Sequence, residues 1–416
     1  MSSRPSSAAP RVLSVFGTRP EAIKMAPVVR ELERRGLESR VCVTGQHREM
    51  LDEVLEFFSV TPDYDLNVMR PGQSPTAVAA AVLDRLEPIL QEEQPDWVLV
   101  QGDTTTAAVA GFAAFYAGAR VGHVEAGLRS HTPREPFPEE INRRVAGVVA
   151  DLHFAPTETA RENLRREGVA EDKVLVTGNP VIDALYSAID SPAPGPDFLD
   201  ELDDDTRLIL VTTHRRESFG DPLRRICRAV RALAETHDDV QVVLPVHPNP
   251  AVSDTVMAEL GGSPRIRLVE PLSYPELAQT LNRAHLVLTD SGGIQEEAPA
   301  LGKPVLVLRD VTERTEGVDA GTARLVGTRA TDIVAAAREL LVDDASYDAM
   351  SQAANPYGDG FAAARIVQAI LTDADRATLE LDRAPLATSL GGVKQPAVSR
   401  DGADEDSAVG GDFIIS

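Results

Sequence analysis

The sequence predicts an α/β protein in which two doubly wound domains face each other across a cleft. Short runs rich in Val, Ile and Leu alternate with longer helical runs along the 416 residues. This alternation is typical of parallel sheets joined by right-handed crossovers. A Pro- and Asp-rich stretch at residues 191–205 divides the alternation into two series and is expected to be a surface linker. We therefore expect one Rossmann-like domain at residues 1–180 and a second at residues 181–360.

The first series begins with an expected strand at residues 11–17 and a helix at residues 21–35, which Gly36 closes. Later β-rich runs of this series predict strands within residues 39–45, 96–102, 120–127 and 173–180. The second series predicts strands within residues 207–214, 240–247, 265–270, 285–290 and 304–310. Helical segments lie between these runs, so each series has the pattern of one parallel sheet.

The charge and cysteine content narrow the class of protein. The formal net charge is −24, from 65 acidic and 41 basic residues, which argues against nucleic acid or an anionic membrane as a partner. Lysine is scarce beside arginine, and this acidic, lysine-poor composition predicts a protein adapted to high salt. The two cysteines, Cys42 and Cys227, fit no metal or redox spacing.

Location and tail are also predicted from composition. The N-terminal stretch has no signal-peptide core, and no segment is long and apolar enough to span a bilayer, so we expect a cytoplasmic protein. Residues 375–416 mix Gly, Ser, Ala and acidic residues without periodicity. We expect them to form a disordered acidic tail.

Polar residues gather where the expected strands end, and open α/β sheets bind ligands at that edge. Each cluster also has a simpler explanation. The threonines at 104–106 could cap a helix together with Asp103, and His247 could be a turn residue. His123 and Glu125 resemble a metal pair, but no third ligand is near them in the sequence, so we expect no metal site. The clusters lie at residues 17–21, 45–48, 102–106, 123–127, 214–217, 247–250, 290–293 and 309–314.

The stretch VLTDSGGIQEEAPALGKPVLVLRD, residues 287–310, suggests what the cleft binds. A strand that turns through Ser291, Gly292 and Gly293 into a helix is expected to hold phosphate oxygens. Glu297 lies about one helical turn further on, away from the phosphate charge, where a carboxylate can accept hydrogen bonds from ribose hydroxyls. Glu296 is expected only to complement the helix dipole, while Arg314 is free to counter phosphate charge. Phosphate and ribose together predict a nucleoside diphosphate site.

The chain closely resembles the non-hydrolysing UDP-N-acetylglucosamine 2-epimerases. Matching stretches cover roughly residues 11–370 in order and include FGTRPEAIKMAPVV, GDTTTAAVA, VGHVEAGLRS, PFPEEINRR, VTGNPVIDAL, THRRESFG, PVHPNP, TERTEGVDAGTARLVGT and NPYGDGFAAARI. The resemblance implies the architecture of the B-type glycosyltransferases (GT-B-like), a homodimer and interconversion of UDP-GlcNAc and UDP-ManNAc. It also implies that a last helix, at about residues 361–374, packs back on the first domain.

The resemblance carries site residues over to this chain. It implies that substrate contacts come from Arg19, Lys24, Asp103, Glu125, His214, Ser291, Gly292, Gly293, Glu297 and Arg314. It implies a catalytic set of Asp103, Glu125, Glu139 and His214. The family reaction eliminates UDP across C1 and C2 to a glucal and adds it back, which needs a base, an acid and cations for the diphosphate. Which carboxylate serves which face of the sugar stays open, and no cofactor is expected.

Some positions depart from the family pattern. Residues 132–137 read TPREPF where members often carry Tyr-Ser-Pro. Gln46, Arg215 and His247 match residues that bind a second, activating UDP-GlcNAc in bacterial members, but Glu49 stands where some members have a second glutamine. The alternatives are a hydrolysing epimerase that releases ManNAc and UDP, a glycosyltransferase of the same architecture, and a sugar-nucleotide-binding regulator. The product is expected to feed surface polysaccharide or glycan synthesis.

Overall fold

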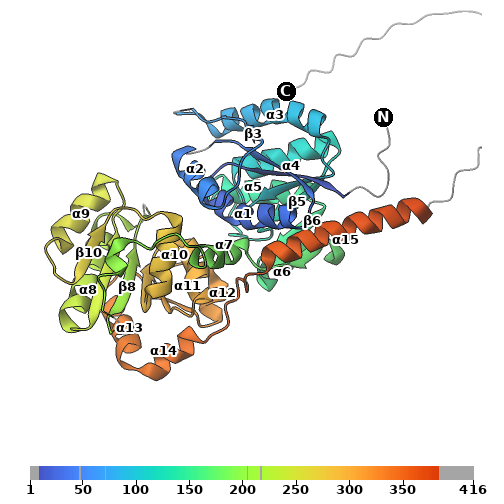
Figure 1. Cartoon of the computed structure of the whole chain (residues 1–416). Coiled ribbons are helices and arrows are strands. Elements are labelled where there is room, and N and C mark those ends of the chain that lie inside the picture. Colours follow the sequence, from blue (N-terminus) through green and yellow to red (C-terminus); the bar gives the residue numbers. More distant parts are fainter. Residues whose placement is uncertain (1–8, 46–47, 71, 204, 216–217, 384–416) are drawn as a thin grey trace, which may run out of the picture.

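Two parallel sheets form the frame of the molecule (Figure 1). The computed structural model describes residues 9–45, 48–70, 72–203, 205–215 and 218–383. The first sheet has the order β3-β2-β1-β4-β5-β6-β7 and the second the order β10-β9-β8-β11-β12-β13, with parallel pairing throughout. The predicted fold class, two doubly wound α/β units, is therefore confirmed. The strands of the first sheet are β1 (Arg11–Phe16), β2 (Glu38–Val43), β3 (Tyr64–Asp65), β4 (Trp97–Gln101), β5 (Arg120–Val124), β6 (Leu152–Ala155) and β7 (Val174–Val176), and those of the second are β8 (Arg207–Thr212), β9 (Val240–Pro245), β10 (Ile266–Val269), β11 (Leu286–Thr289), β12 (Val305–Val307) and β13 (Ala323–Leu325).

The strand order places the ligand-binding edge. In each sheet the order reverses beside the first strand of the series, between β1 and β4 and between β8 and β11. Loops at such a switch point diverge to opposite faces and leave a crevice between them. Three of the observed strands, β3, β6 and β13, are absent from the predicted set, because β3 has only two residues and because His153 and Arg324 interrupt the short apolar runs of β6 and β13. The strands that border both switch points are all in the predicted set.

Helices cover the sheets and bring their N-termini to the loops after the strands. The helix predicted at residues 21–35 begins at Arg19, because Thr18 and Glu21 form a capping box. The helices are α1 (Arg19–Arg34), α2 (Arg48–Phe57), α3 (Pro75–Glu93), α4 (Thr105–Ala117), α5 (Glu139–Val149), α6 (Glu158–Arg166), α7 (Pro180–Ile189), α8 (Asp221–Thr236), α9 (Pro250–Leu260), α10 (Tyr274–Arg283), α11 (Gly292–Ala300), α12 (Thr315–Asp319), α13 (Ala330–Val342), α14 (Asp344–Ser351) and α15 (Ala362–Arg383).

The central strands are buried on both faces. All five residues of β4 are buried, and so are all four of β11. Continuous apolar strands of this kind are typical of parallel sheets covered by helices on both sides. Each fully buried Val or Leu contributes roughly 1.5–3 kcal/mol relative to an exposed one. The sheets are therefore a stable scaffold, and the polar residues that matter for function lie at their ends.

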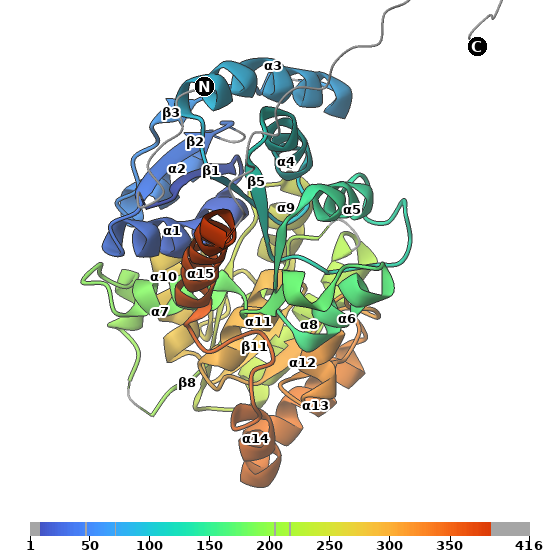
Figure 2. The ribbon, with the colours of Figure 1, turned by 90° about the vertical axis from the view of Figure 1, so that its right-hand side faces the viewer.

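Two helices connect the halves. Helix α7 packs on α1 beside the first sheet and on α10 and α11 beside the second. Helix α15 packs on α1 and α7, and Figure 2 shows it running along that side of the molecule. The buried carboxylate of Asp183 in α7 accepts hydrogen bonds from the backbone N–H groups of Ala362 and Ala363, at 3.1 and 2.9 Å, and so holds the start of α15. The two crossing helices thus hold the halves against each other.

Two predictions about connecting segments need correction. Helix α15 continues to Arg383, so the prediction of a disordered tail is wrong for residues 375–383, and residues 384–416 lie outside the described part of the chain. Within the predicted surface linker, a short 3₁₀ helix (Asp197–Leu199) contains the buried Phe198, whose ring lies 5.9 Å from the Arg267 guanidinium. The sequence did not predict the burial of Phe198, because the acidic residues around it indicate a surface segment and composition alone does not show which aromatic side chain packs against the core.

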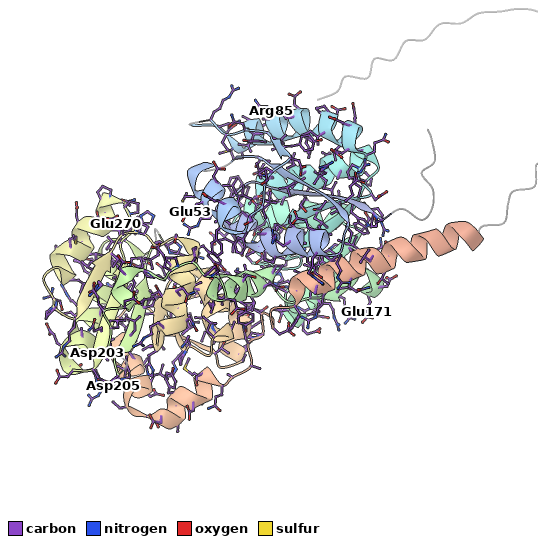
Figure 3. All side chains as sticks on the ribbon, viewed as in Figure 1. Glu53, Arg85, Glu171, Asp203, Asp205 and Glu270 are labelled. Carbon is purple, nitrogen blue, oxygen red and sulfur yellow. The ribbon has the colours of Figure 1, made fainter. Side chains whose placement is uncertain are left out.

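Acidic side chains are spread over the outside of both halves (Figure 3). The labelled residues Glu53, Glu171, Asp203, Asp205 and Glu270 are all exposed. The net charge is −24, and repulsion between such surface charges is screened by salt. Among the described residues, no helix is both long and apolar enough to cross a membrane.

Candidate active site

A cavity of about 470 Å³ opens between the two halves of the molecule. Helix α1 borders it on one side, and the loops that follow β8, β9 and β11 border it on the other. It therefore lies at the switch point of the second sheet, and its size suits a small-molecule ligand. Of the sequence-predicted residues, those that line it are Arg19, Lys24, His214, His247, Ser291, Gly293, Glu297 and Arg314.

The predicted phosphate turn begins helix α11. Ser291 is its N-cap residue, and its side chain makes no capping hydrogen bond within the described residues. A Cβ atom added at Gly292 would lie 3.3 Å from Glu313 Oε1 and 3.8 Å from Arg314 Cζ. The glycine thus keeps the turn open beside a guanidinium group. Backbone N–H groups at a helix N-terminus, next to a cation, are suited to phosphate oxygens.

Asp290 fixes this turn to the end of β8. Its buried carboxylate accepts hydrogen bonds from the backbone N–H groups of His214 and Arg215 at about 3.1 Å and from Ser218 Oγ at 2.8 Å. The His214 ring is about half exposed, and its Nδ1 lies 3.2 Å from Asp290 Oδ1. Burial opposes ionisation of Asp290, but these hydrogen bonds and His214 lower its pKa. Asp290 therefore aims His214 at the cavity, a role that its place in the sequence did not reveal.

Glu297 lies closer to the phosphate turn than the sequence suggested. Its Oε2 is 3.6 Å from the position of a Cβ on Gly293, because helical side chains lean towards the N-terminus of their helix. Its Oε1 accepts a hydrogen bond of 3.1 Å from the hydroxyl of Tyr274. Burial raises the pKa of Glu297 to about 7 even though this hydrogen bond opposes the shift. The carboxyl lines the cavity, as a ribose acceptor requires.

Glu125 is the most strongly held of the predicted catalytic carboxylates. It follows β5 with a left-handed φ of 61°, so strand alternation does not describe its direction. Its Oε1 lies 2.6 Å from Lys24 Nζ, and Gln101 Nε2 donates to its Oε2. Burial opposes ionisation, but Lys24 and Arg314 outweigh it and lower the pKa of Glu125. Glu125 is therefore a buried, ionised carboxylate beside a cation that lines the cavity.

His123 is buried, and its ring pairs with the backbone. Its Nε2 pairs with the carbonyl oxygen of Gly102 at 2.8 Å, and burial lowers its pKa to about 4, so the ring is neutral at pH 7. No group of three or more His, Cys, Asp or Glu side chains in the described ranges could hold a metal ion. In the described structure, His123 and Glu125 therefore have separate partners, Gly102 and Lys24, although they are two residues apart in the sequence.

Asp103 and Glu139 do not line the cavity. Both lie at helix α5: Glu139 belongs to it, and Asp103 contacts two of its residues. Asp103 forms an ion pair with Arg143, and its carbonyl oxygen accepts a hydrogen bond of 3.0 Å from Asn142 Nδ2. Glu139 is the first residue of the same helix, and its buried Oε2 has no hydrogen-bond partner among the described residues. The Thr104 hydroxyl caps α4 by accepting from Ala107 N at 3.0 Å, so the helix-cap explanation is correct for that threonine.

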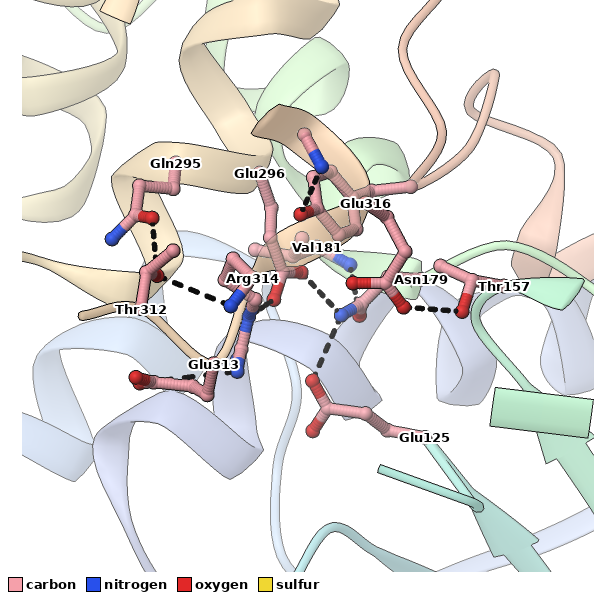
Figure 4. A network of polar contacts seen from close by, with 12 residues as sticks. Glu125, Thr157, Asn179, Val181, Gln295, Glu296, Thr312, Glu313, Arg314 and Glu316 are labelled. Carbon is pink, nitrogen blue, oxygen red and sulfur yellow. Dashed lines mark hydrogen bonds and ion pairs between the residues drawn. The ribbon is translucent and has the colours of Figure 1, made fainter. Parts of the chain in front are cut away.

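A polar network joins the two halves directly (Figure 4). Asn179 Nδ2 donates to Glu125 Oε1 at 2.8 Å and to Glu296 Oε2 at 2.6 Å, and Arg314 Nε donates to Glu296 Oε1. The prediction that Arg314 is free is therefore wrong, and so is the prediction that Glu296 only complements the helix dipole. Both errors have one cause, because sequence spacing does not show ion pairs between distant segments. Asn179 was missed for the same reason, although it precedes Pro180 as the N-cap of α7.

The residues predicted for a second, activating nucleotide are only partly described. Gln46 lies outside the described residues, and so does the side chain of Glu49. Arg215 donates to Glu313 at 2.9 Å, beside the phosphate turn. His247 lines the cavity, and its Nδ1 accepts a hydrogen bond of 3.1 Å from Asn249 N, as a turn histidine would. Arg215 and His247 therefore lie around the same cleft as the candidate substrate site.

Comparison with known proteins agrees with this geometry. The family described as UDP-N-acetylglucosamine 2-epimerase matches residues 30–371. The chain is 54% identical over 368 residues to the UDP-N-acetylglucosamine 2-epimerase of Yersinia pestis and 53% identical to that of Escherichia coli K12, in each case over 86% of this chain and 98% of the relative.

Solved structures are similar along nearly their whole length. The UDP-GlcNAc 2-epimerase of Neisseria meningitidis, bound to UDP-GlcNAc, is 44% identical with a TM-score of 0.79, covering 87% of this chain and 100% of that one. The Methanocaldococcus jannaschii UDP-GlcNAc 2-epimerase, in complex with UDP-GlcNAc and UDP, is 32% identical with a TM-score of 0.73, covering 87% and 99%. The chain belongs to the UDP-N-acetylglucosamine 2-epimerase family.

Proposed function

We propose that the chain interconverts UDP-GlcNAc and UDP-ManNAc by inverting C2 of the sugar through elimination and re-addition of UDP. The family supports the epimerisation. The observation that carries the route is Glu125, a buried and ionised carboxylate that is paired with Lys24. Lys24 in turn lines a cavity that is suited to a nucleotide. A carboxylate held beside a cation can take a proton from carbon in the step that expels a diphosphate.

The reaction needs groups on both faces of the sugar. A carboxylate removes the C2 proton, the C1–O bond breaks, and UDP departs with the bonding electrons, which leaves a 2-acetamidoglucal with a C1–C2 double bond. UDP then adds back to C1 while a second acid delivers a proton to the opposite face of C2. Asp103, Glu125 and Glu139 are the groups we assign to these proton transfers, and His214 is the neighbouring group that completes the catalytic set.

The second sheet binds the nucleotide in this account. The turn at Ser291, Gly292 and Gly293 receives the diphosphate at the N-terminus of α11. Arg19, Lys24 and Arg314 neutralise its charge, and each of them lines the cavity. Glu297 accepts hydrogen bonds from the ribose hydroxyls, since it lies within the same cavity and is close to the turn. Charge that develops on the leaving diphosphate is thus stabilised by groups already in place.

Product analysis tests this proposal against its rivals. The protein is incubated with UDP-GlcNAc alone, with no nicotinamide, divalent metal or acceptor, and the nucleotide sugars are separated and identified. We expect a mixture of UDP-GlcNAc and UDP-ManNAc. Accumulation of free ManNAc with UDP would instead identify a hydrolysing epimerase. An unchanged substrate that is consumed only when an acceptor is added would identify a glycosyltransferase, and binding without turnover would identify a regulator.

The outer face of α4 and α5 supports a homodimer. Phe115 and Tyr116 on α4 are 59% and 71% exposed, and Val148 on α5 is 86% exposed. The two helices pack against each other, so these exposed side chains lie on neighbouring elements. Contiguous exposed apolar residues mark interaction sites, and a second copy is the simplest self-complementary partner. We expect light scattering to give twice the chain mass, and Val148→Asp to give the monomer mass.

The surface charge supports function at high salt. The net charge of −24 is carried by exposed acidic residues such as Glu53 and Glu270. Salt screens their repulsion and thereby stabilises the folded state. We expect folding, measured by circular dichroism, and turnover to require molar salt. Full structure and full turnover in dilute buffer would contradict this part of the proposal.

A further inference from the structure

Two buried carboxylates and two partly buried cations lie together where the two halves meet. Lys24 lies 2.6 Å from Glu125, and Arg314 is paired with Glu296, as Figure 4 shows for the second pair. Asn179 donates one hydrogen bond to each carboxylate and so joins the two ion pairs. Two cations balance two carboxylates, so the cluster is neutral when all four groups are ionised. That neutrality allows both carboxylates to be charged although they are almost inaccessible to water.

A nucleoside diphosphate would disturb this balance. Lys24 and Arg314 both line the cavity, and Arg314 Cζ is 3.8 Å from a Cβ built on Gly292 of the phosphate turn. Phosphate oxygens would attract both cations away from their carboxylates. The two buried carboxylates would then keep only amide donors: Asn179 is shared between them, and Gln101 donates to Glu125. Buried charges without partners are strongly unfavourable, and a carboxyl group in that position neutralises by taking up a proton.

The surroundings decide which carboxylate takes the proton. Burial raises the pKa of Glu296, and the negative charge of Glu125 adds to this shift, whereas Arg314 and Lys24 oppose it. Glu125 has a second donor in Gln101, and its pKa is lowered. Glu296 is therefore the group that protonates first. The charged and titratable groups that face it are Lys24 from α1, Glu125 after β5, Arg314 before α12, Glu297 in its own helix, and Tyr357 between α14 and α15.

We propose that Glu296 is a positioning residue that takes up a proton from solvent when a nucleoside diphosphate binds, releasing Arg314 to the ligand while Glu125 stays ionised. The inference rests on the proposed function, since it assumes a diphosphate in this cavity. Its only bond change is the transfer of a proton from a buffer acid to a carboxylate oxygen of Glu296. Protonated Glu296 can still accept from Asn179, so the link between the halves is kept.

Calorimetric titration with UDP tests the inference. Binding heats are measured at about pH 8 in two buffers of different ionisation enthalpy, because the terminal phosphate of the ligand, with a pKa of about 6, does not titrate there. We expect a net uptake of a clear fraction of one proton in the wild type. The affinity should fall as pH rises, by up to about tenfold per pH unit between the pKa of Glu296 in the free protein and its higher pKa in the complex, and should level off above the latter.

Two variants assign the proton. Glu296→Gln should abolish the uptake, because the amide cannot titrate. Glu313→Gln is the matched control, since Glu313 also borders Arg314 but is ionised throughout: burial opposes this, yet Arg314 and Arg215 lower its pKa to about 2. Uptake should persist in this control. Unchanged uptake in Glu296→Gln would place the proton on another group, such as Glu297, whose pKa burial raises to about 7, and would overturn the inference.

The remaining outcomes are also decisive. Tight UDP binding by the wild type without proton uptake overturns the inference and leaves the proposed function intact. Absence of UDP binding by the folded wild type removes the proposed function and the inference with it. If Glu296→Gln does not fold, an infrared difference spectrum on addition of UDP is recorded in Glu297→Gln, which silences the neighbouring carboxyl. A new protonated-carboxyl band supports the inference, and its absence overturns it.

Discussion

The two sheets have corresponding strand orders around their switch points, but different groups occupy the helix N-termini there. In the first sheet, the backbone N–H groups of Gly17 and Thr18, before α1, donate to Glu21 at 3.0 and 2.7 Å. At α4 the hydroxyl of Thr104 caps the helix and donates to the same glutamate at 2.7 Å. The anion sites that helix N-termini usually offer are thus filled by the protein itself.

The second sheet leaves the corresponding position open. Helix α11 follows β11, and its first two residues are the glycines Gly292 and Gly293. No described side chain caps this helix, and the turn lines the cavity. Topology therefore favours a ligand site at both switch points. The residues at the helix N-termini decide which of the two sites can bind an anion. In the proposed function, the first half contributes the carboxylates for proton transfer together with Arg19 and Lys24, and the second half contributes the phosphate turn and Glu297.

The largest effect is expected from Glu125→Gln on the first sheet. Loss of one acid/base group lowers turnover by roughly 10²–10⁴-fold. UDP binding, measured by calorimetry, should be retained, because the phosphate turn, Glu297 and the cations assigned to the diphosphate are all unchanged. Loss of UDP affinity with near-normal turnover at saturation would mean that Glu125 serves binding instead of chemistry, and the division between the sheets would fail.

Glu21→Ala should affect stability and not ligand binding. The substitution leaves the buried N–H groups of Gly17 and Thr18 without their acceptor, and each unsatisfied group costs roughly 1–3 kcal/mol. We therefore expect the free energy of unfolding in denaturant to fall by about 2–6 kcal/mol, with the UDP affinity of the folded variant unchanged. Weaker UDP binding at wild-type stability would show that the Glu21 carboxylate serves the nucleotide site and not the fold.

Glu297→Ala should have the opposite pattern. Hydrogen bonds to a charged group contribute about 1.5–3 kcal/mol, so UDP affinity should weaken by roughly tenfold to a hundredfold. Glu297→Gln keeps one acceptor oxygen and should lose less affinity. Unchanged UDP binding in both variants would make Glu297 a partner of Tyr274 only, and the ribose assignment would be withdrawn.

The smallest effect is expected from Gly292→Ala. Its backbone is helical and not left-handed, and the nearest atoms to an added Cβ belong to the flexible side chains of Glu313 and Arg215, at 3.3 and 3.5 Å. Thermal unfolding should therefore change little, while the methyl group stands beside the proposed phosphate position and weakens UDP several-fold, on the order of 1 kcal/mol. Equal UDP affinity in this variant would indicate that the diphosphate does not approach Gly292.

Most of the fold could be predicted from the sequence because its signals are local. Continuous apolar runs predict buried parallel strands, and a Ser-Gly-Gly turn after such a run predicts where a helix N-terminus opens. Strand β3 escaped because it has only two residues, and β13 escaped because Arg324 interrupts it, whereas the equally short β12 is apolar throughout. The packed Phe198 escaped because its acidic neighbours dominate the composition of that segment.

The candidate site was predictable as a set of residues but not as a set of contacts. Lys24, Glu125 and Arg314 were identified from the resemblance, but their pairing was not. Lys24 and Glu125 come from segments about a hundred residues apart, and Arg314 meets Glu296 from a different element 18 residues away. Spacing also could not show that Asn179 bridges the two halves. Ion pairs between distant segments arise from packing, so only the folded structure reveals which cations are engaged.

Deuterium incorporation tests the central claim, that carboxylates of the first sheet exchange the C2 proton while the second sheet holds UDP. UDP-GlcNAc is converted in heavy water without nicotinamide or divalent metal, and C2 of the product is examined by proton NMR. The account predicts UDP-ManNAc with deuterium at C2, since the returning proton comes from a group equilibrated with solvent. UDP-ManNAc whose C2 hydrogen derives wholly from the substrate would contradict it.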